Sequence, residues 1–274
     1  DEERDGLVYT DDLVSLAPAS FLSFAPFGAG PVRLAFVDDQ VKDDSVDWKL
    51  GMNWQVAMDT LLYASISQGT KSGGFFTGVV TSDEQLIPYG PEQLVSYEIG
   101  LKTQAADLGL SYEAAVFYYD YEDVQTFITD DSGAVPVDRL GNVSGATIHG
   151  LDAALQWRPP SLSGLALYAS IGLLDTELDS FVSGATTIPK GNEQPDAPGF
   201  SGNLAASYEF NLSDSASMQI AVDGRYQGDT YRSVLNEVFS ETASYWVINA
   251  RVSLYLQNEW EVTAWGRNIN DEEY

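Results

Sequence analysis

The sequence predicts an all-β protein, an antiparallel up-and-down transmembrane β-barrel, from three observations. Apolar residues recur at every second position through most of the chain, as in Trp246, Ile248 and Ala250 with polar residues between them. This alternation gives an extended strand one dry face and one wet face. Short and long connections alternate between these segments, and aromatic residues gather near the segment ends. Barrels in membranes combine these features.

The alternating segments run from residue 48 to residue 264. We expect about ten or eleven strands, each near the ~9–11 residues that a tilted strand needs to cross a bilayer. The alternation is visible in 48–56, 60–68, 97–102, 112–118, 151–158, 165–171, 203–210, 219–225, 245–254 and 260–264. Short turns are expected at 57–59, 105–107, 159–164, 211–215 and 257–258. Long loops are expected at 71–92, 130–145, 177–198 and 229–243.

The first part of the chain has no clear periodicity. Residues 1–44 are expected to form loops and one short strand at 32–37, and residues 45–274 to form the barrel strands, the long extracellular loops and the short periplasmic turns. The pairs Asp38-Asp39 and Asp43-Asp44 are interpreted as solvated loop charges. A calcium site there stays open as an alternative, although the ordered spacing of a known calcium loop is absent.

Composition excludes several classes of function. The 274 residues carry a net charge of -28, with 13 Lys and Arg against 41 Asp and Glu, so nucleic acid is not an expected partner. Cysteine is absent, which excludes disulfides and thiolate metal sites. His149 is the only histidine, so neither a histidine metal site nor a histidine-containing triad can be assembled. We predict no catalytic residue, no metal site, no cofactor and no enzyme activity.

Charged and aromatic residues are placed as a barrel wall in a membrane requires. The apolar faces carry no charge, because a Lys or Arg facing lipid at mid-bilayer costs roughly 2–4 kcal/mol. The residues predicted to face the lumen are Lys49, Glu98, Lys102, Glu113, Asp152, Asp223, Arg225 and Arg251. The predicted aromatic girdles contain Trp54, Trp157 and Trp260 beside short turns, and Trp48 and Trp246 beside long loops.

Four segments resemble known motifs in a fixed order. They are LYASISQGTKSGGF at 62–75, PEQLVSYEIGLK at 91–102, GLD at 150–152 and WGRNINDEEY at 265–274. Together they are similar to the C-terminal barrel region of TonB-dependent outer-membrane receptors, and the resemblance covers the chain from about residue 46 onward.

The resemblance implies about half of a closed barrel of roughly 22 strands. Such receptors carry an N-terminal plug domain with a box that TonB grips, and neither the plug nor the family's last strand is visible in these residues. The implied function is import of a scarce nutrient, such as a ferric siderophore or similar iron complex, across the outer membrane of a Gram-negative bacterium. The implied partners are outer-membrane lipid, a small metal chelate, and TonB acting through a plug outside this chain.

Aromatic and basic residues in two long loops are the candidate ligand-binding residues. They are Phe75, Phe76 and Tyr89 in one loop, and Tyr231 and Arg232 in another. Packing within the loops is an equally good interpretation of these side chains. Two other functions stay open: a porin without a plug, and a soluble β-sandwich binding module such as a lectin-like domain.

Overall fold

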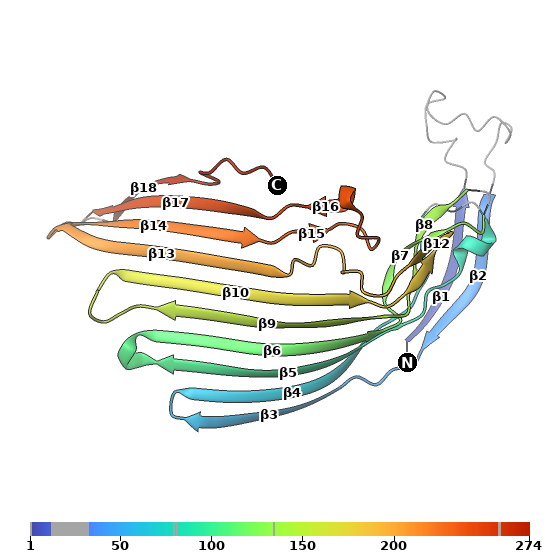
Figure 1. Cartoon of the computed structure of the whole chain (residues 1–274), viewed down its shortest axis with the longest axis horizontal. Helices are drawn as coiled ribbons and strands as arrows, with labels where there is room; N and C mark the ends of the chain where they lie inside the picture. Colours follow the sequence, from blue (N-terminus) through green and yellow to red (C-terminus); the bar gives the residue numbers. More distant parts are fainter. Residues whose placement is uncertain (1, 12–32, 79, 81, 134, 257–258) are drawn as a thin grey trace.

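Ten strands of the chain form one open antiparallel sheet, curved like part of a barrel wall (Figure 1). The computed structural model describes residues 2–11, 33–78, 80, 82–133, 135–256 and 259–274. Each strand pairs with its neighbours in chain order, and β3 and β18 are the two edges. The strands are β3 (Trp48–Ala57), β4 (Thr60–Lys71), β5 (Glu92–Ala105), β6 (Leu110–Glu122), β9 (Gly145–Trp157), β10 (Leu165–Leu178), β13 (Phe200–Ser213), β14 (Ala216–Gln227), β17 (Tyr245–Leu256) and β18 (Trp260–Gly266). The predicted all-β, partial-barrel fold is confirmed.

Short turns join the strands at one end of the sheet, and long connections join them at the other (Figure 1). The long connections are more ordered than the sequence predicts, because most of them contain a hairpin that satisfies its own backbone groups. These hairpins are β7 (Gln125–Asp130) with β8 (Val137–Asn142), β11 (Phe181–Ser183) with β12 (Thr186–Ile188), and β15 (Thr230–Tyr231) with β16 (Glu241–Thr242). In the part of the chain that the structure describes, the connections also contain the 3-10 helices η2 (Asp83–Leu86), η3 (Ala106–Leu108) and η4 (Val238–Ser240).

The N-terminal region differs from the sequence prediction. β1 (Glu2–Asp11) pairs with β2 (Arg33–Asp43), so the strand expected at 32–37 is longer than predicted. Backbone pairing with β1 extends β2 through Asp38, Asp39 and Asp43, which were predicted in a loop. The predicted loop residues 12–32 lie outside the described residues. Among the described residues, no three His, Cys, Asp or Glu gather as a metal site would require.

The strand register separates two faces of the sheet. Residues directly opposite each other on paired strands share a face. One row therefore runs through Met52, Ala64, Ile99, Val116, Leu151, Leu173 and Phe200. We call the side of this row the apolar face and the opposite side the polar face. Leu50 is 69% exposed and Trp54 is 59% exposed on the apolar face. The tryptophans meet no second sheet in the described part of the chain, so the β-sandwich interpretation is wrong.

The buried core lies at the loop end of the sheet, where the ends of β9 and β10 meet the long connections. It contains Val143, Ala146, Leu178, Phe181 and Ile188. A smaller cluster joins Val80 and Leu86, with Phe76 and Val137 packed against it. In the residues that the structure describes, no helix has the length and apolar character needed to cross a bilayer.

Candidate functional site: the polar face and the loop cluster

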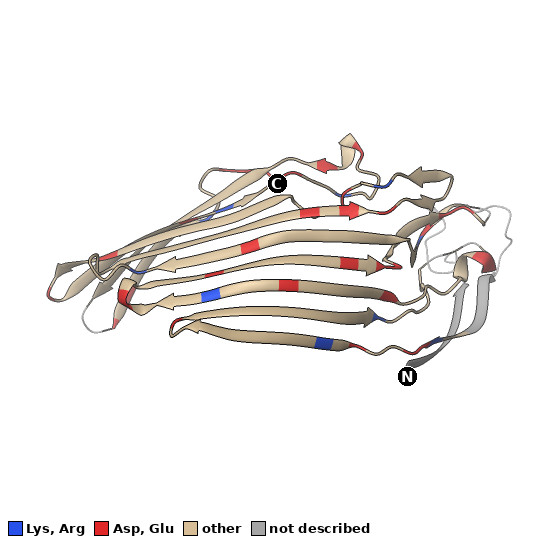
Figure 2. Ribbon diagram, turned by 60° about the horizontal axis from the view of Figure 1, so that its bottom comes forward, with Lys and Arg blue, Asp and Glu red and all other residues tan. Residues whose placement is uncertain are grey.

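The predicted lumen-facing residues share the polar face of the sheet. Glu113 lies opposite Lys102. Asp152 lies opposite Ala115, which is the next residue after Glu113 on the polar face of β6. On the other half of the sheet, Asp223 and Arg225 alternate along β14 while Arg251 lies opposite Ala221. Figure 2 shows how sparsely charged residues are spread along the strands. Lys49 lies opposite Ser67, and Glu98 lies opposite Ser65, on this same face.

Side chains on the polar face bind one another across strands while they stay exposed. The Lys102 Nζ lies 3.3 Å from Glu113 Oε2, with more than half of each side chain exposed. Asn249 Nδ2 donates a hydrogen bond to Asp223 Oδ2 at 2.7 Å. Arg251 Nη2 donates to Gln219 Oε1 at 3.0 Å. Exposed pairs of this kind contribute little to stability, so the polar face is a hydrated surface that keeps its charges available.

Four of the predicted girdle tryptophans lie at or next to strand ends: Trp48 is first in β3, Trp246 second in β17, Trp157 last in β9 and Trp260 first in β18. Trp54 lies three residues before the end of β3. Sequence reasoning missed Trp265, which lies on the polar face opposite Arg251. The Arg267 guanidinium lies 5.2 Å from the Trp265 ring centre. The position of Trp265 could have been predicted from the alternation of Trp260, Val262 and Ala264. These even-numbered residues share the apolar face, so residue 265 falls on the polar face.

The long connections 72–91, 123–144, 179–199 and 228–244 form one continuous loop cluster. The side chains of Gln125 and Asn142 make the first set of hydrogen bonds between two of these connections. Gln125 Nε2 donates to the carbonyl oxygens of Ser72 and Gly90, each at 3.0 Å. The Gly90 N–H donates to Asn142 Oδ1 at 2.6 Å, and Asn142 Nδ2 donates to Gly90 O at 3.1 Å. These bonds fix the β4–β5 connection onto the β7–β8 hairpin.

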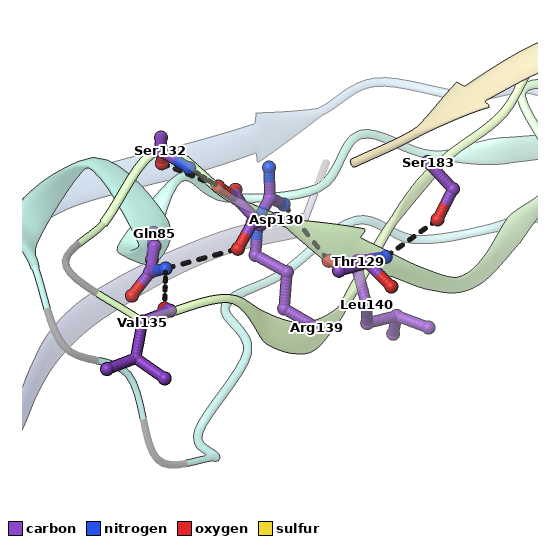
Figure 3. A network of polar contacts seen from close by, with 8 residues as sticks. All are labelled: Gln85, Thr129, Asp130, Ser132, Val135, Arg139, Leu140 and Ser183. Carbon is purple, nitrogen blue, oxygen red and sulfur yellow. Dashed lines mark hydrogen bonds and ion pairs between the residues drawn. The ribbon is translucent and has the colours of Figure 1, made fainter. Parts of the chain in front are cut away.

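A second set of hydrogen bonds links the β4–β5 connection to the β7–β8 hairpin (Figure 3). Gln85 is fully buried, and its Nε2 donates to Asp130 O at 3.2 Å and to Val135 O at 3.0 Å. Arg139 Nε lies 2.5 Å from Asp130 Oδ2. Burial opposes ionisation of Asp130, but hydrogen bonds from Ser132 and Arg139 outweigh it and hold the pKa of this carboxyl below its ordinary value.

The same hairpin contacts the next connection along the rim. The Thr129 N–H donates to Ser183 Oγ at 2.8 Å (Figure 3). The Gly184 N–H donates to Thr129 O at 2.7 Å. The apolar core around Ile188 lies between these two connections. The β7–β8 hairpin is therefore bound to its neighbours on both sides.

A further set of hydrogen bonds links the connection before β13 to the connection before β17. Asn236 has a positive φ of 50°, and its Oδ1 accepts the Glu193 N–H at 2.6 Å. Asn236 Nδ2 donates to Glu193 O at 3.0 Å. The Asp196 N–H donates to Tyr231 O at 2.8 Å. Every neighbouring pair of connections is thus joined by hydrogen bonds.

The candidate ligand-binding residues lie in two separate connections. Phe76 packs edge-on against Phe127, with ring centres 6.0 Å apart. Tyr89 exchanges two backbone hydrogen bonds of 2.9 Å with Gly74, and Phe75 is half-buried beside that bridge.

On the other side, Tyr231 pairs with Glu241 in the β15–β16 hairpin. Arg232 Nε donates to Thr242 Oγ1 at 3.0 Å. The structure gives these residues roles within their own loops and brings the two groups into no contact among the described residues. Their ligand-binding role stays a prediction. The side-chain amides of Gln85, Gln125 and Asn142, which join the long connections, have no local signature in the sequence.

Comparison with known proteins identifies the family. A family model described as TonB dependent receptor-like, beta-barrel, matches residues 23–269. The chain is 31% identical over 116 residues to the pesticin receptor of Yersinia enterocolitica serotype O:8 / biotype 1B, which is 42% of this chain and 16% of that receptor. The pesticin receptor of Yersinia pestis is 30% identical over the same length.

Solved structures show the same fold. The ferric yersiniabactin uptake receptor FyuA from Yersinia pestis superposes with a TM-score of 0.70 at 17% identity, over 88% of this chain and 34% of that one. The siderophore receptor PiuA from Acinetobacter baumannii gives a TM-score of 0.63 at 18% identity, over 94% of this chain and 34% of that one. The chain spans about a third of these structures. With its family model covering nearly the whole sequence, this chain belongs to the TonB-dependent receptor β-barrel family.

Proposed function

We propose that this chain is part of the wall and the outer rim of an outer-membrane transporter in a Gram-negative bacterium. The transporter imports a scarce nutrient, a ferric siderophore or a similar iron complex, and takes its energy from TonB through a plug domain. The observation that carries the proposal is the separation of an exposed apolar face from a charged polar face over ten paired strands. Lipid contacts the first face and water contacts the second.

The polar face supplies the path. Its carboxylates, among them Glu98, Glu113 and Asp152, give the wall a hydrated surface that tolerates cations. In this proposal no covalent chemistry takes place on the chain, because the charged groups of the polar face are solvated or paired with neighbours. Transport therefore needs binding, release and an opening, and no catalytic step.

The loop cluster supplies the entrance. Because hydrogen bonds join each connection to the next, we expect the rim to keep one shape while ligand binds. In that case the path opens by movement of the plug and not by separation of the four connections. The candidate residues Phe75, Phe76, Tyr89, Tyr231 and Arg232 belong to this rim.

Relatives support a nutrient receptor. FyuA is described as a ferric yersiniabactin uptake receptor and PiuA as a siderophore receptor. Another neighbour in structure is the copper transporter OprC, with a TM-score of 0.65 at 15% identity over 86% of this chain and 36% of that one. We favour iron because two of these three descriptions concern siderophores, and we keep a porin without a plug as the alternative.

Uptake of radiolabelled iron tests the proposal. The full-length receptor is expressed in an iron-starved host that lacks its own siderophore receptors, and ferric siderophores of several classes are supplied. We expect uptake of at least one of them, saturating with concentration and abolished when TonB is deleted. Uptake that persists without TonB favours the porin, and failure to transport any iron complex contradicts the proposal.

A further inference from the structure

Four short turns lie at one end of the sheet (Figure 1), and each presents a large apolar side chain to solvent. These residues are Met58 between β3 and β4, Leu108 between β5 and β6, Leu162 between β9 and β10, and Leu212 beside the β13–β14 turn. Met58 is fully exposed, and each leucine is more than half exposed. A single exposed leucine is ordinary on a protein surface. Because such a residue recurs from turn to turn, we call these four residues the turn row.

The turn row is continuous with the apolar face of the sheet. Leu110 and Leu165 begin β6 and β10 on this face, directly after two of the turns. Trp157 lies opposite Leu110, and its Nε1 donates a hydrogen bond to Leu108 O at 3.2 Å. A tryptophan at a membrane interface places its ring among apolar groups and its N–H on a polar partner. From the row of Val116 to the turns, no charged residue of the described strands occupies the apolar face.

The apolar face ends differently on the side of the loop cluster. On β6 the apolar-face positions after Val116 are Tyr118 and then Asp120. On β10, Asp175 directly follows Leu173 on the same face. Both carboxylates are exposed, and a carboxylate that faces hydrocarbon is unfavourable. The strands therefore extend beyond the hydrocarbon on the loop side, and the bilayer is displaced toward the short turns.

The backbone of the turns is hydrogen-bonded to neighbouring hairpins. In three of the turns, one carbonyl oxygen accepts a backbone N–H from the next hairpin. The pairs are Asp59 with Gln104, Gly109 with Arg158, and Gly164 with Glu209, at 2.9, 2.8 and 3.0 Å. These bonds fix the turns to one another and satisfy carbonyl groups that turns on a protein surface commonly leave to water.

Three carbonyl oxygens of the turn row itself also have partners within the protein. Leu108 O accepts the Trp157 Nε1–H, Leu162 O accepts the Leu165 N–H at 3.0 Å, and Met58 O accepts Gln55 Nε2 at 3.4 Å. At membrane depth, where water is scarce, backbone polar groups need partners from the protein. These turns can consequently enter a lipid leaflet without leaving those carbonyl oxygens unpaired.

We infer that the short turns insert into the lipid leaflet at their end of the barrel, with the turn row as its apolar anchors. The partner is the boundary between headgroups and acyl chains, where anchors of this kind bury their apolar side chains. The anchors fix the depth of the barrel in the bilayer. This inference goes beyond the proposed function, because it concerns where the membrane lies and holds for a porin as well as for a receptor.

Site-directed spin labelling measures this depth, and the 274 residues contain no cysteine that would interfere. Single labels at Leu108→Cys, Val116→Cys and Asp120→Cys report three levels along the β5–β6 hairpin and β6. Labels at Leu162→Cys, Leu173→Cys and Asp175→Cys repeat the series along β10. The full-length receptor, freed of any other cysteine, is placed in vesicles of phosphatidylethanolamine and phosphatidylglycerol. Collisions of each label are measured with oxygen, which dissolves in lipid, and with a nickel chelate supplied on both sides of the membrane.

The two turn labels should behave like the labels in the middle of the wall. Since a charged or polar chelate is excluded from hydrocarbon, we expect the oxygen-to-chelate collision ratio at Leu108→Cys to exceed that at Asp120→Cys by about tenfold. The same difference is expected between Leu162→Cys and Asp175→Cys. A bilayer centred on the middle of β6 gives the opposite order, because Asp120 is nearer to Val116 along the chain than Leu108 is.

Chelate collisions that dominate at both turn labels would place the turns in water and overturn the inference. Lipid contact at only one of the two turns also overturns it, because the anchors would then not be a common property of the turns. A turn label that meets neither reagent is covered by protein, such as the plug or a second copy, and contradicts it too. Each variant is first shown to fold by its heat-dependent shift in gel mobility. If Leu108→Cys does not fold, Met58→Cys takes its place.

Discussion

In the ten-stranded sheet, large apolar side chains such as Leu50 and Met52 are 69% and 60% exposed, whereas in the loop cluster Ile188 and Gln85 are fully buried. Both regions come from one chain of β-strands and hairpins. The sheet has no protein covering its apolar face within the described residues, and an exposed apolar surface of that extent is unfavourable in water. The loop cluster buries its own side chains and pairs its own polar groups. The comparison supports the proposal that lipid covers the apolar face of the sheet, while internal contacts stabilise the loop cluster.

The largest expected effect comes from placing a charge on the apolar face. Val116 lies in the middle of β6 on this face, and its neighbour Ala115 lies on the polar face. We expect Val116→Lys to lower the free energy of unfolding of the full-length receptor in lipid vesicles by roughly 2–4 kcal/mol, and Ala115→Lys by less than about 1 kcal/mol. Urea titration followed by gel mobility measures both.

Equal losses for the two lysine variants would mean that the two faces do not meet different solvents. In that case the comparison between the sheet and the rim loses its basis, because the apolar face would be no more sensitive to charge than the polar face.

A smaller and local effect is expected from Gln85→Ala in the loop cluster. The substitution removes a fully buried side chain whose amide donates to the carbonyl oxygens of Asp130 and Val135. A hydrogen bond of this kind contributes about 0.5–1.5 kcal/mol to stability. We expect faster hydrogen exchange at the β7–β8 hairpin and unchanged exchange in the sheet, as measured by mass spectrometry. Gln93, which is exposed on β5, provides the control Gln93→Ala. Faster exchange throughout the sheet would show that the rim and the wall are one stability unit.

The sheet could be predicted from the sequence because its pattern is local. Each strand carries its own alternation, and short turns bring similar strands side by side, so the face of a residue follows from its parity. The same parity assigns Trp265 to the polar face. Prediction of the strands and of their order in the sheet required no information from distant segments.

The rim could not be predicted in the same way, because its contacts join segments far apart in sequence. Gln85 binds residues 45 and 50 positions away, and no periodicity marks a glutamine for burial. The role of Phe76 could not be predicted for a similar reason. An aromatic side chain in a glycine-rich loop fits both packing on Phe127 and binding of a ligand, and the sequence does not distinguish the two. The motif at 265–274 predicted no turn, because the bonds of Asn270 to Ile248 and Trp246 of β17 depend on β18 being shorter than its partner.

Acidity should weaken the rim before it affects the wall. Burial, the largest single influence, raises the pKa of Asp130. Hydrogen bonds from Ser132 and Arg139 together lower it by more, so the pKa in the folded state lies below its ordinary value of 3.8. A lowered folded pKa contributes stability above the unfolded pKa, and this contribution is lost as the pH falls through the folded pKa. A hydrogen bond to a charged group contributes about 1.5–3 kcal/mol to stability.

Pepsin digestion between about pH 5 and pH 2 measures this effect. We expect cleavage of the wild type within the β7–β8 hairpin to rise at the acid end relative to Asp130→Asn, which lacks the titrating group and is cleaved readily throughout. The ratio of the two proteins removes the pH dependence of the protease itself. A constant ratio would show that ionisation of Asp130 does not order the hairpin.

The smallest effect is expected where charges meet on the wall. Lys102 and Glu113 lie 3.3 Å apart on the polar face, with side chains 56% and 57% exposed. Water screens such a pair, so Lys102→Met should change the free energy of unfolding in vesicles by less than about 1 kcal/mol. Arg139→Met provides the contrast, because Arg139 pairs with Asp130 among side chains only about 10% exposed and its loss should loosen the β7–β8 hairpin measurably. If Lys102→Met were the more damaging of the two, the polar face would be dry in the assembled receptor, and a hydrated path along it could not exist.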